Sequence, residues 1–149
     1  MFKVQFVLDA FRNEAERILS EAYLQIMLRA LYAINRLWLR SHPEAPRLYN
    51  AGVRYKAEPI GEENWQDIPT TLALGYGDCE DLACARAAEL AERDGIPAVP
   101  VFRWRQEGTL SLYHILVEYP DGHLEDPSRR LGMSTSRDIR KRWGLLWAA

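Results

Sequence analysis

The first third of the chain has the most regular hydrophobic pattern. From about Asp9 to Arg40, apolar residues recur every three or four positions, which is the spacing of one broad stripe on an α-helix. Because no Gly or Pro occurs before Pro43, one helix of about 40 Å is expected, unless it breaks near Asn13 or Ser20. Two interpretations stay open: a core helix packed on its own domain, or a surface for self-association or for a partner. The stripe consists of Ile18, Leu19, Ala22, Tyr23, Ile26, Met27, Ala30, Leu31, Ile34, Leu37 and Trp38.

Residues 41–77 have no sustained hydrophobic period. They are rich in Pro and Gly, which predicts an irregular connection, with a short strand around Val53 to Lys56. Their aromatic and aliphatic content indicates that the segment packs over the rest of the domain rather than being disordered.

A second helix is expected from Cys79 to about Arg93. Asp78 is a favourable N-cap before it, and Gly95 and Pro97 end it. Three apolar segments follow, separated by RQEG and PDG, and they predict short antiparallel strands over 97–104, 109–119 and 123–127. Residues 134–149 are expected to form a final short basic helix.

These elements predict a single α+β domain over residues 1–149. We expect a long N-terminal helix in 1–45, a central core in 65–133 and the basic C-terminal helix in 134–149. A chain of 149 residues with 48% hydrophobic residues can bury one core of ordinary size.

The charge pattern excludes some partners. A formal net charge of −2 gives no overall basic field, so nucleic acid is an unlikely ligand. No stretch is apolar enough to span a membrane, and the first residues lack the features of a secretory signal, so we expect a cytoplasmic protein with reduced cysteines. The basic stretch 129–142 fits either an acidic or phosphate-bearing partner, or a solvated helix face.

Cys79 is the candidate nucleophile. It lies in the first turn of the expected helix, where the helix dipole and free backbone N–H groups favour a thiolate and can hold an oxyanion. The preceding Gly77 and Asp78 predict a tight turn that leaves the sulfur exposed at the helix tip. Cys84 is expected to be a small buried residue beside alanines of the same helix.

His114 and Asp126 are the candidate base and its orienting group. A thiol nucleophile needs such a pair, although a histidine in an apolar strand can also be a core residue. If 120–122 form a three-residue turn with Gly122 left-handed, Leu116 pairs with Asp126, which then shares a face with His114. We expect that face to turn toward the start of the Cys79 helix, with Tyr113, Ile115 and Val117 on the other side of the strand.

Cys, His and Asp in this order, with the Cys opening a helix and the others on neighbouring strands, resemble the transglutaminase-like branch of the papain-like cysteine proteases. The matching stretches are GDCEDLA at 77–83, YHILV at 113–117 and EDP at 125–127, and the GDCED start looks most like bacterial transglutaminase-like cysteine proteinases. The resemblance covers roughly Trp65 to Met133 and implies a papain-like fold. Glu80 stands where animal transglutaminases have a Trp after the nucleophile, which favours hydrolysis over protein cross-linking.

The resemblance also implies roles for these side chains. Cys79 would be the nucleophile, His114 the general base and then acid, and Asp126 the group that fixes the imidazole tautomer. Papain-like enzymes add a polar side chain to the oxyanion hole from upstream of the Cys, and Gln66 is the Gln that precedes it here.

Three carboxylates surround the candidate thiol, namely Asp78, Glu80 and Asp81. They fit capping and dipole compensation, or a calcium site, since clustered carboxylates at a loop-to-helix turn suit a hard cation. No cofactor is required by the expected chemistry. Zinc is disfavoured, because Cys79 and Cys84 lie about 140° apart around a helix.

The sequence thus predicts a thiol-dependent hydrolase of amide or peptide bonds that acts through a thioester on a protein or peptide substrate. Two alternatives remain. The thioester could pass its acyl group to an amine instead of water, or the chain could be a non-enzymatic assembly or adaptor protein that retains the fold.

Overall fold

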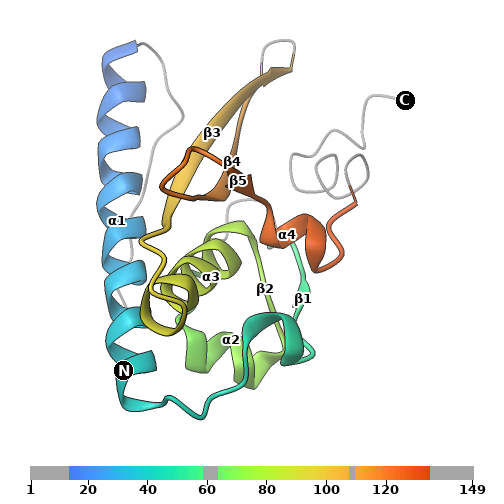
Figure 1. Ribbon diagram of the computed structural model, residues 1–149. Helices are drawn as coiled ribbons and strands as arrows, with labels where there is room; N and C mark the ends of the chain where they lie inside the picture. Colours follow the sequence, from blue (N-terminus) through green and yellow to red (C-terminus); the bar gives the residue numbers. More distant parts are fainter. Residues whose placement is uncertain (1–13, 59–63, 108–109, 135–149) are drawn as a thin grey trace.

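The computed structural model describes residues 14–58, 64–107 and 110–134 (Figure 1). The described chain is α+β, as predicted, and the expected helix over 134–149 lies almost wholly outside it. In chain order the elements are α1 (Glu14–Ser41), the 3-10 turn η1 (Leu48–Asn50), β1 (Arg54–Tyr55), α2 (Ile68–Leu74), β2 (Tyr76–Gly77), α3 (Cys79–Arg93), β3 (Val99–Glu107), β4 (Leu110–Glu118), β5 (Leu124–Glu125) and α4 (Pro127–Arg130).

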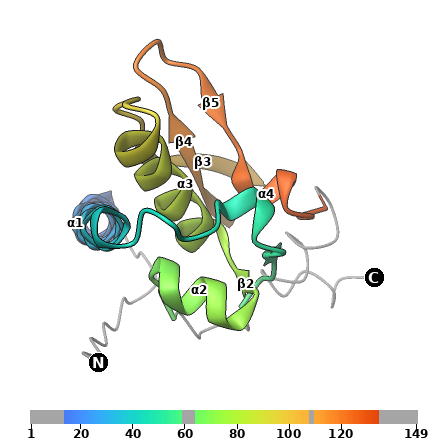
Figure 2. The same cartoon turned by 60° about the horizontal axis from the view of Figure 1, so that its bottom comes forward.

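Helix α3 lies at the centre of the fold, with α1 along one side and the sheet along another (Figures 1 and 2). It begins at Cys79 and ends at Arg93, as the sequence predicts. Its small side chains let neighbours approach closely, and Ala83, Cys84 and Ala87 are fully buried with Leu28 of α1 and Ile115 of β4. This apolar cluster holds the helix against both layers.

One face of α1 is a core face, which agrees with the first of its two interpretations. Leu28 and Leu31 are buried against α3. At the same contact, Arg36 and Arg40 both hydrogen bond to the Glu92 carboxylate of α3. The opposite face of α1 is exposed.

Strands β3, β4 and β5 form an antiparallel sheet in that order. The register pairs Val117 with Glu125 and Glu118 with Leu124, and Tyr119 N–H donates to the His123 carbonyl at 2.8 Å. Gly122 has a φ of 85°, the left-handed conformation that the three-residue turn requires. The predicted register of this hairpin is therefore confirmed, whereas β3 runs on to Glu107, past its expected end at residue 104.

The prediction that 41–77 is irregular, apart from one short strand, is wrong in part. Strand β1 occurs where expected and pairs in parallel with β2, but the segment also contains η1 and α2. Helix α2 has local signals: the Asp67 side chain accepts from Thr70 N–H at the N-cap, and Gly75 ends the helix with a φ of 75°. It is only seven residues long, too short to display a hydrophobic period.

Within the described residues, the helices lack a segment of the length and apolarity that a bilayer crossing demands.

Candidate active site

Cys79 occupies the first position of α3, but its side chain is not exposed. The residue is fully buried in the cluster that includes Ala83 and Ile115, which overturns the expectation of a sulfur open to solvent at the helix tip. The Cys79 thiol donates a hydrogen bond to Glu80 Oε2 at 3.1 Å. The S–H group is thus directed at the neighbouring carboxyl group rather than at an imidazole.

His114 and Asp126 meet as the register predicts. His114 Nε2 lies 3.0 Å from Asp126 Oδ2, and the two side chains are 27% and 20% exposed. With Nε2 donating to the carboxylate, Nδ1 is the ring nitrogen that can accept a proton. A carboxylate in this place fixes the tautomer and orientation of the ring.

Asp126 is anchored by a second contact. It is the N-cap of α4, and its Oδ1 accepts from Arg129 N–H at 3.1 Å. Pro127 therefore begins a helix, and the strand expected over 123–127 is limited to Leu124–Glu125. Burial raises the pKa of Asp126, but the hydrogen bonds from His114 and Arg129 N–H outweigh burial and lower it below its usual value. The carboxylate is thus ionised at neutral pH.

The face of β4 that packs on α3 is the opposite of the one expected. Ile115 and Val117 are fully buried in the cluster with Cys79, and alternation along the strand puts His114 on the other face. Burying two β-branched apolar side chains stabilises the fold more than burying an imidazole, and this decides which face meets the helix. Cys79 therefore packs on the face of β4 opposite to the one that carries His114, so the structure does not bring the two candidate residues together on one face.

Gln66 lies against the first turn of α3. Its backbone N–H donates to Asp81 Oδ1 at 2.7 Å, so the thirteen-residue gap to Cys79 folds back onto the start of the nucleophile helix. The side chain is buried, and its Oε1 finds no hydrogen-bond partner in the described part of the chain. The unpartnered atom is an acceptor, so it could take a hydrogen bond from a donor on a ligand.

The acidic residues around Cys79 are buried with it. Asp81 Oδ2 accepts from Asp78 N–H at 3.1 Å, which fits the capping interpretation for Asp81. Burial and the neighbouring charge of Glu80 raise the pKa of Asp81 well above its usual value. Among the described residues, none of the His, Cys, Asp and Glu side chains gather in threes as a metal site would require, and calcium stays a prediction.

Cys84 has the structural role expected of it. It is fully buried, and its thiol lies 3.7 Å from the Leu28 carbonyl of α1 as a weak donor. Burial and the charge of Asp81 raise its pKa, so it is a poor source of thiolate.

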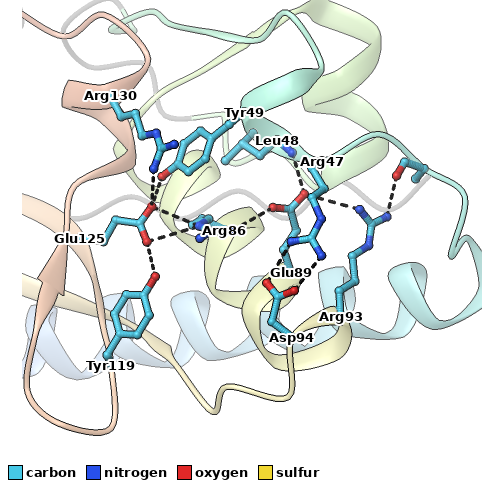
Figure 3. A network of polar contacts seen from close by, with 11 residues as sticks. Arg47, Leu48, Tyr49, Arg86, Glu89, Arg93, Asp94, Tyr119, Glu125 and Arg130 are labelled. Carbon is cyan, nitrogen blue, oxygen red and sulfur yellow. Dashed lines mark hydrogen bonds and ion pairs between the residues drawn. The ribbon is translucent and has the colours of Figure 1, made fainter.

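Sequence analysis missed Glu125, the hub of a polar network next to the candidate site (Figure 3). Tyr49 and Tyr119 both donate to its carboxylate through their hydroxyls, and Arg86 Nε of α3 donates to Oε1 at 3.1 Å. The network joins Glu125 of β5, the residue directly before Asp126, to Arg86 of α3 and to Tyr49 of η1. The pairing with Val117 puts Glu125 on the face of β4 that the sequence analysis expected to turn away from α3, so the sequence did not indicate this position.

Comparisons of the chain with protein-family models, curated proteins and solved structures return no match.

Proposed function

We propose that this chain is a thiol-dependent hydrolase of amide bonds, with a papain-like arrangement in which Cys79 is the nucleophile, His114 the base and Asp126 the orienting group. The observation that carries the proposal is the hydrogen bond between His114 Nε2 and Asp126 Oδ2, because it leaves Nδ1 as the proton acceptor. The place of Cys79 at the start of α3 adds support, since backbone N–H groups of a first helical turn stabilise a thiolate and an oxyanion.

The reaction has two halves. His114 takes the thiol proton, the sulfur attacks the substrate carbonyl, and the C–N bond breaks as the amine leaves with that proton. Water then attacks the thioester, with the imidazole again as base, and releases the acid and the thiol. Gln66 is the proposed side-chain donor to the oxyanion, supported by its buried amide beside the first turn of α3.

Because the Cys79 sulfur is buried, bonded to Glu80 and packed on the face of β4 opposite to His114, the reaction requires a movement that exposes the sulfur and brings it to the imidazole. We propose that substrate binding causes this movement. In such an enzyme the site is assembled only when substrate binds, and the thiol stays shielded from water until then. The expected consequence is slow reaction with small electrophiles and faster reaction with peptide-based ones.

The test is alkylation of the full chain at neutral pH with iodoacetamide and with peptidyl vinyl sulfones, followed by mass mapping. We expect Cys79 to react faster than Cys84 with both reagents, and we expect His114→Ala to slow only the reaction at Cys79. Cys84→Ala is the matched control. Equal rates at the two thiols, or faster reaction at Cys84, would remove the nucleophile assignment.

Acyl transfer is separated from hydrolysis by adding hydroxylamine to a reaction with a peptide substrate. Hydroxamate formation at the expense of acid would show that an amine reaches the thioester, whereas acid alone supports hydrolysis.

A non-enzymatic assembly role is the second candidate, and one observation favours it: the Cys79 thiol is buried and hydrogen bonded to a carboxylate. Under this alternative Cys79 is a core residue like Cys84. Its prediction is that both thiols stay unreactive with every peptide electrophile until the chain unfolds.

A further inference from the structure

Helix α1 has a second apolar face that its own domain does not cover. Ile26 is 64% exposed and Leu37 is 61% exposed, while the buried residues of α1 lie on the opposite side of the helix. A helix that is apolar on both faces normally has a partner on each. The exposed residues, here called the α1 stripe, are Ile18, Leu19, Ala22, Tyr23, Ile26, Ala30, Ala33, Ile34 and Leu37.

We propose that the α1 stripe packs against the α1 stripe of a second copy of this chain, with the two helices antiparallel. The proposal does not depend on the proposed enzymatic function, because no residue of the stripe belongs to the candidate active site.

The spacing along the stripe is that of a two-helix seam. Six of its residues follow one another at alternating intervals of four and three, as the core positions of a heptad repeat do. In an antiparallel pair these six positions meet in three kinds of layer, and a single register places one of the six opposite each of the others. The facing pairs in that register are Leu19 with Leu37, Tyr23 with Ala33, and Ile26 with Ala30.

This register favours close packing. In the central layers each large side chain faces an alanine, so the helices can approach without leaving gaps. A parallel pair would instead stack Tyr23 on Tyr23 and Ala30 on Ala30, so that one layer is crowded and another is underfilled. Side-chain size along the stripe therefore selects the antiparallel orientation.

The length of the helix sets the strength of the contact. At 28 residues α1 is about 42 Å long and about 10 Å wide, so the pair covers on the order of 1,000 Å² in total. This area is at the lower end for a specific interface, and we expect a dimer that dissociates on dilution into the low micromolar range.

The first test is the molar mass of the full chain by sedimentation velocity across a concentration series. We expect a monomer–dimer equilibrium, and we expect Ile26→Glu to give a monomer at every concentration, with the Tm of the parent when both are diluted to the monomer. The matched control is Leu74→Glu on α2, where an equally charged substitution at a 49% exposed leucine leaves the mass unchanged. A full chain that is monomeric at about 100 µM overturns the proposal, because the contact would then be too weak to be specific. If the full chain were monomeric but a chain beginning at residue 14 dimerised, residues 1–13 would be the segment that covers the α1 stripe.

The second test is orientation, measured by mixing Leu19→Cys and Leu37→Cys proteins under oxidising conditions. An antiparallel pair gives the mixed disulfide between the two variants, because residues 19 and 37 of different copies face each other. It gives no Leu19→Cys homodimer, since the two residues 19 would be about 27 Å apart. Homodimeric disulfides in place of the mixed product would overturn the antiparallel arrangement.

Discussion

His114 Nε2 and Asp126 Oδ2 lie 3.0 Å apart because the hairpin between them, which joins β4 to β5, has a turn of three residues and not two. In this register Leu116 is opposite Asp126, so the carboxylate shares a face with His114 on the diagonal. A shift of one residue would move Asp126 to the other face and separate the pair. The geometry of the candidate site therefore depends on the backbone of Gly122, which lies outside it.

Gly122→Ala is expected to lower the free energy of unfolding by about 1–2 kcal/mol. The φ of 85° strains any L side chain, and nothing lies within 4 Å of the added Cβ, so the cost is that of the backbone alone. Urea denaturation measures it, and Gly122→Asn is the control, since Asn tolerates this conformation better. An alanine variant as stable as the parent would show that the turn is not held in this conformation.

Asp126→Asn is expected to slow the reaction of Cys79 with peptide electrophiles by about tenfold or more. The amide can present N–H to His114 and so favour the wrong tautomer, as carboxylate-to-amide changes do in catalytic triads. Because Asn is also a good N-cap for α4, the free energy of unfolding should change by less than about 1 kcal/mol. Asp126→Ala loses the cap as well and should be about 1 kcal/mol less stable again. Unchanged labelling in the Asn variant would separate Asp126 from the chemistry.

Glu125→Gln is expected to lower the free energy of unfolding at neutral pH. The variant should also lose less of that free energy than the parent as the pH falls. Burial raises the pKa of Glu125, but Tyr119, Tyr49 and Arg86 together lower it below 4.5. A carboxyl with a lowered folded-state pKa contributes stability above its unfolded pKa, and this contribution disappears as the pH falls through the folded value.

The measurement is the free energy of unfolding from pH 7 downward for the parent and the variant. We expect a difference of about 1.5–3 kcal/mol at pH 7, as for hydrogen bonds to a charged group, which narrows below about pH 4.5. Glu44→Gln, on an exposed loop, is the control and should follow the parent. A difference that stays constant with pH would mean that Glu125 acts through packing rather than charge.

Leu28→Ala is expected to destabilise the fold by about 2–5 kcal/mol, because this fully buried side chain lies between α1 and α3 and its loss leaves a cavity. Leu74→Ala removes the same atoms from a half-exposed site and should change stability by about 0.5 kcal/mol or less. Thermal and urea unfolding of both variants test the pair. Similar losses in the two would contradict the burial of this face of α1.

Local chemistry was enough to predict several elements from the sequence alone. The ends of α3 follow from Asp78 before it and Gly95 after it, and the hairpin register follows from residues 120–122. These signals act between neighbours in the chain, so they do not depend on what packs against them. The pairing of His114 with Asp126 is predictable for the same reason. Helix α2 had equally local signals in Asp67 and Gly75, but it is too short to show a period.

Only the tertiary structure decided which surfaces are buried. Sequence alternation put His114 and Ile115 on opposite faces of β4, but the apolar neighbours on α1 and α3 determined that Ile115 turns inward. The same packing buries Cys79, although its place at a helix start suggested exposure. Glu125 accepts a hydrogen bond from Tyr49, which is far away in the sequence, and no local pattern predicts such a contact. Burial is a sum over neighbours from the whole chain, whereas caps, turns and registers are set by a few adjacent residues.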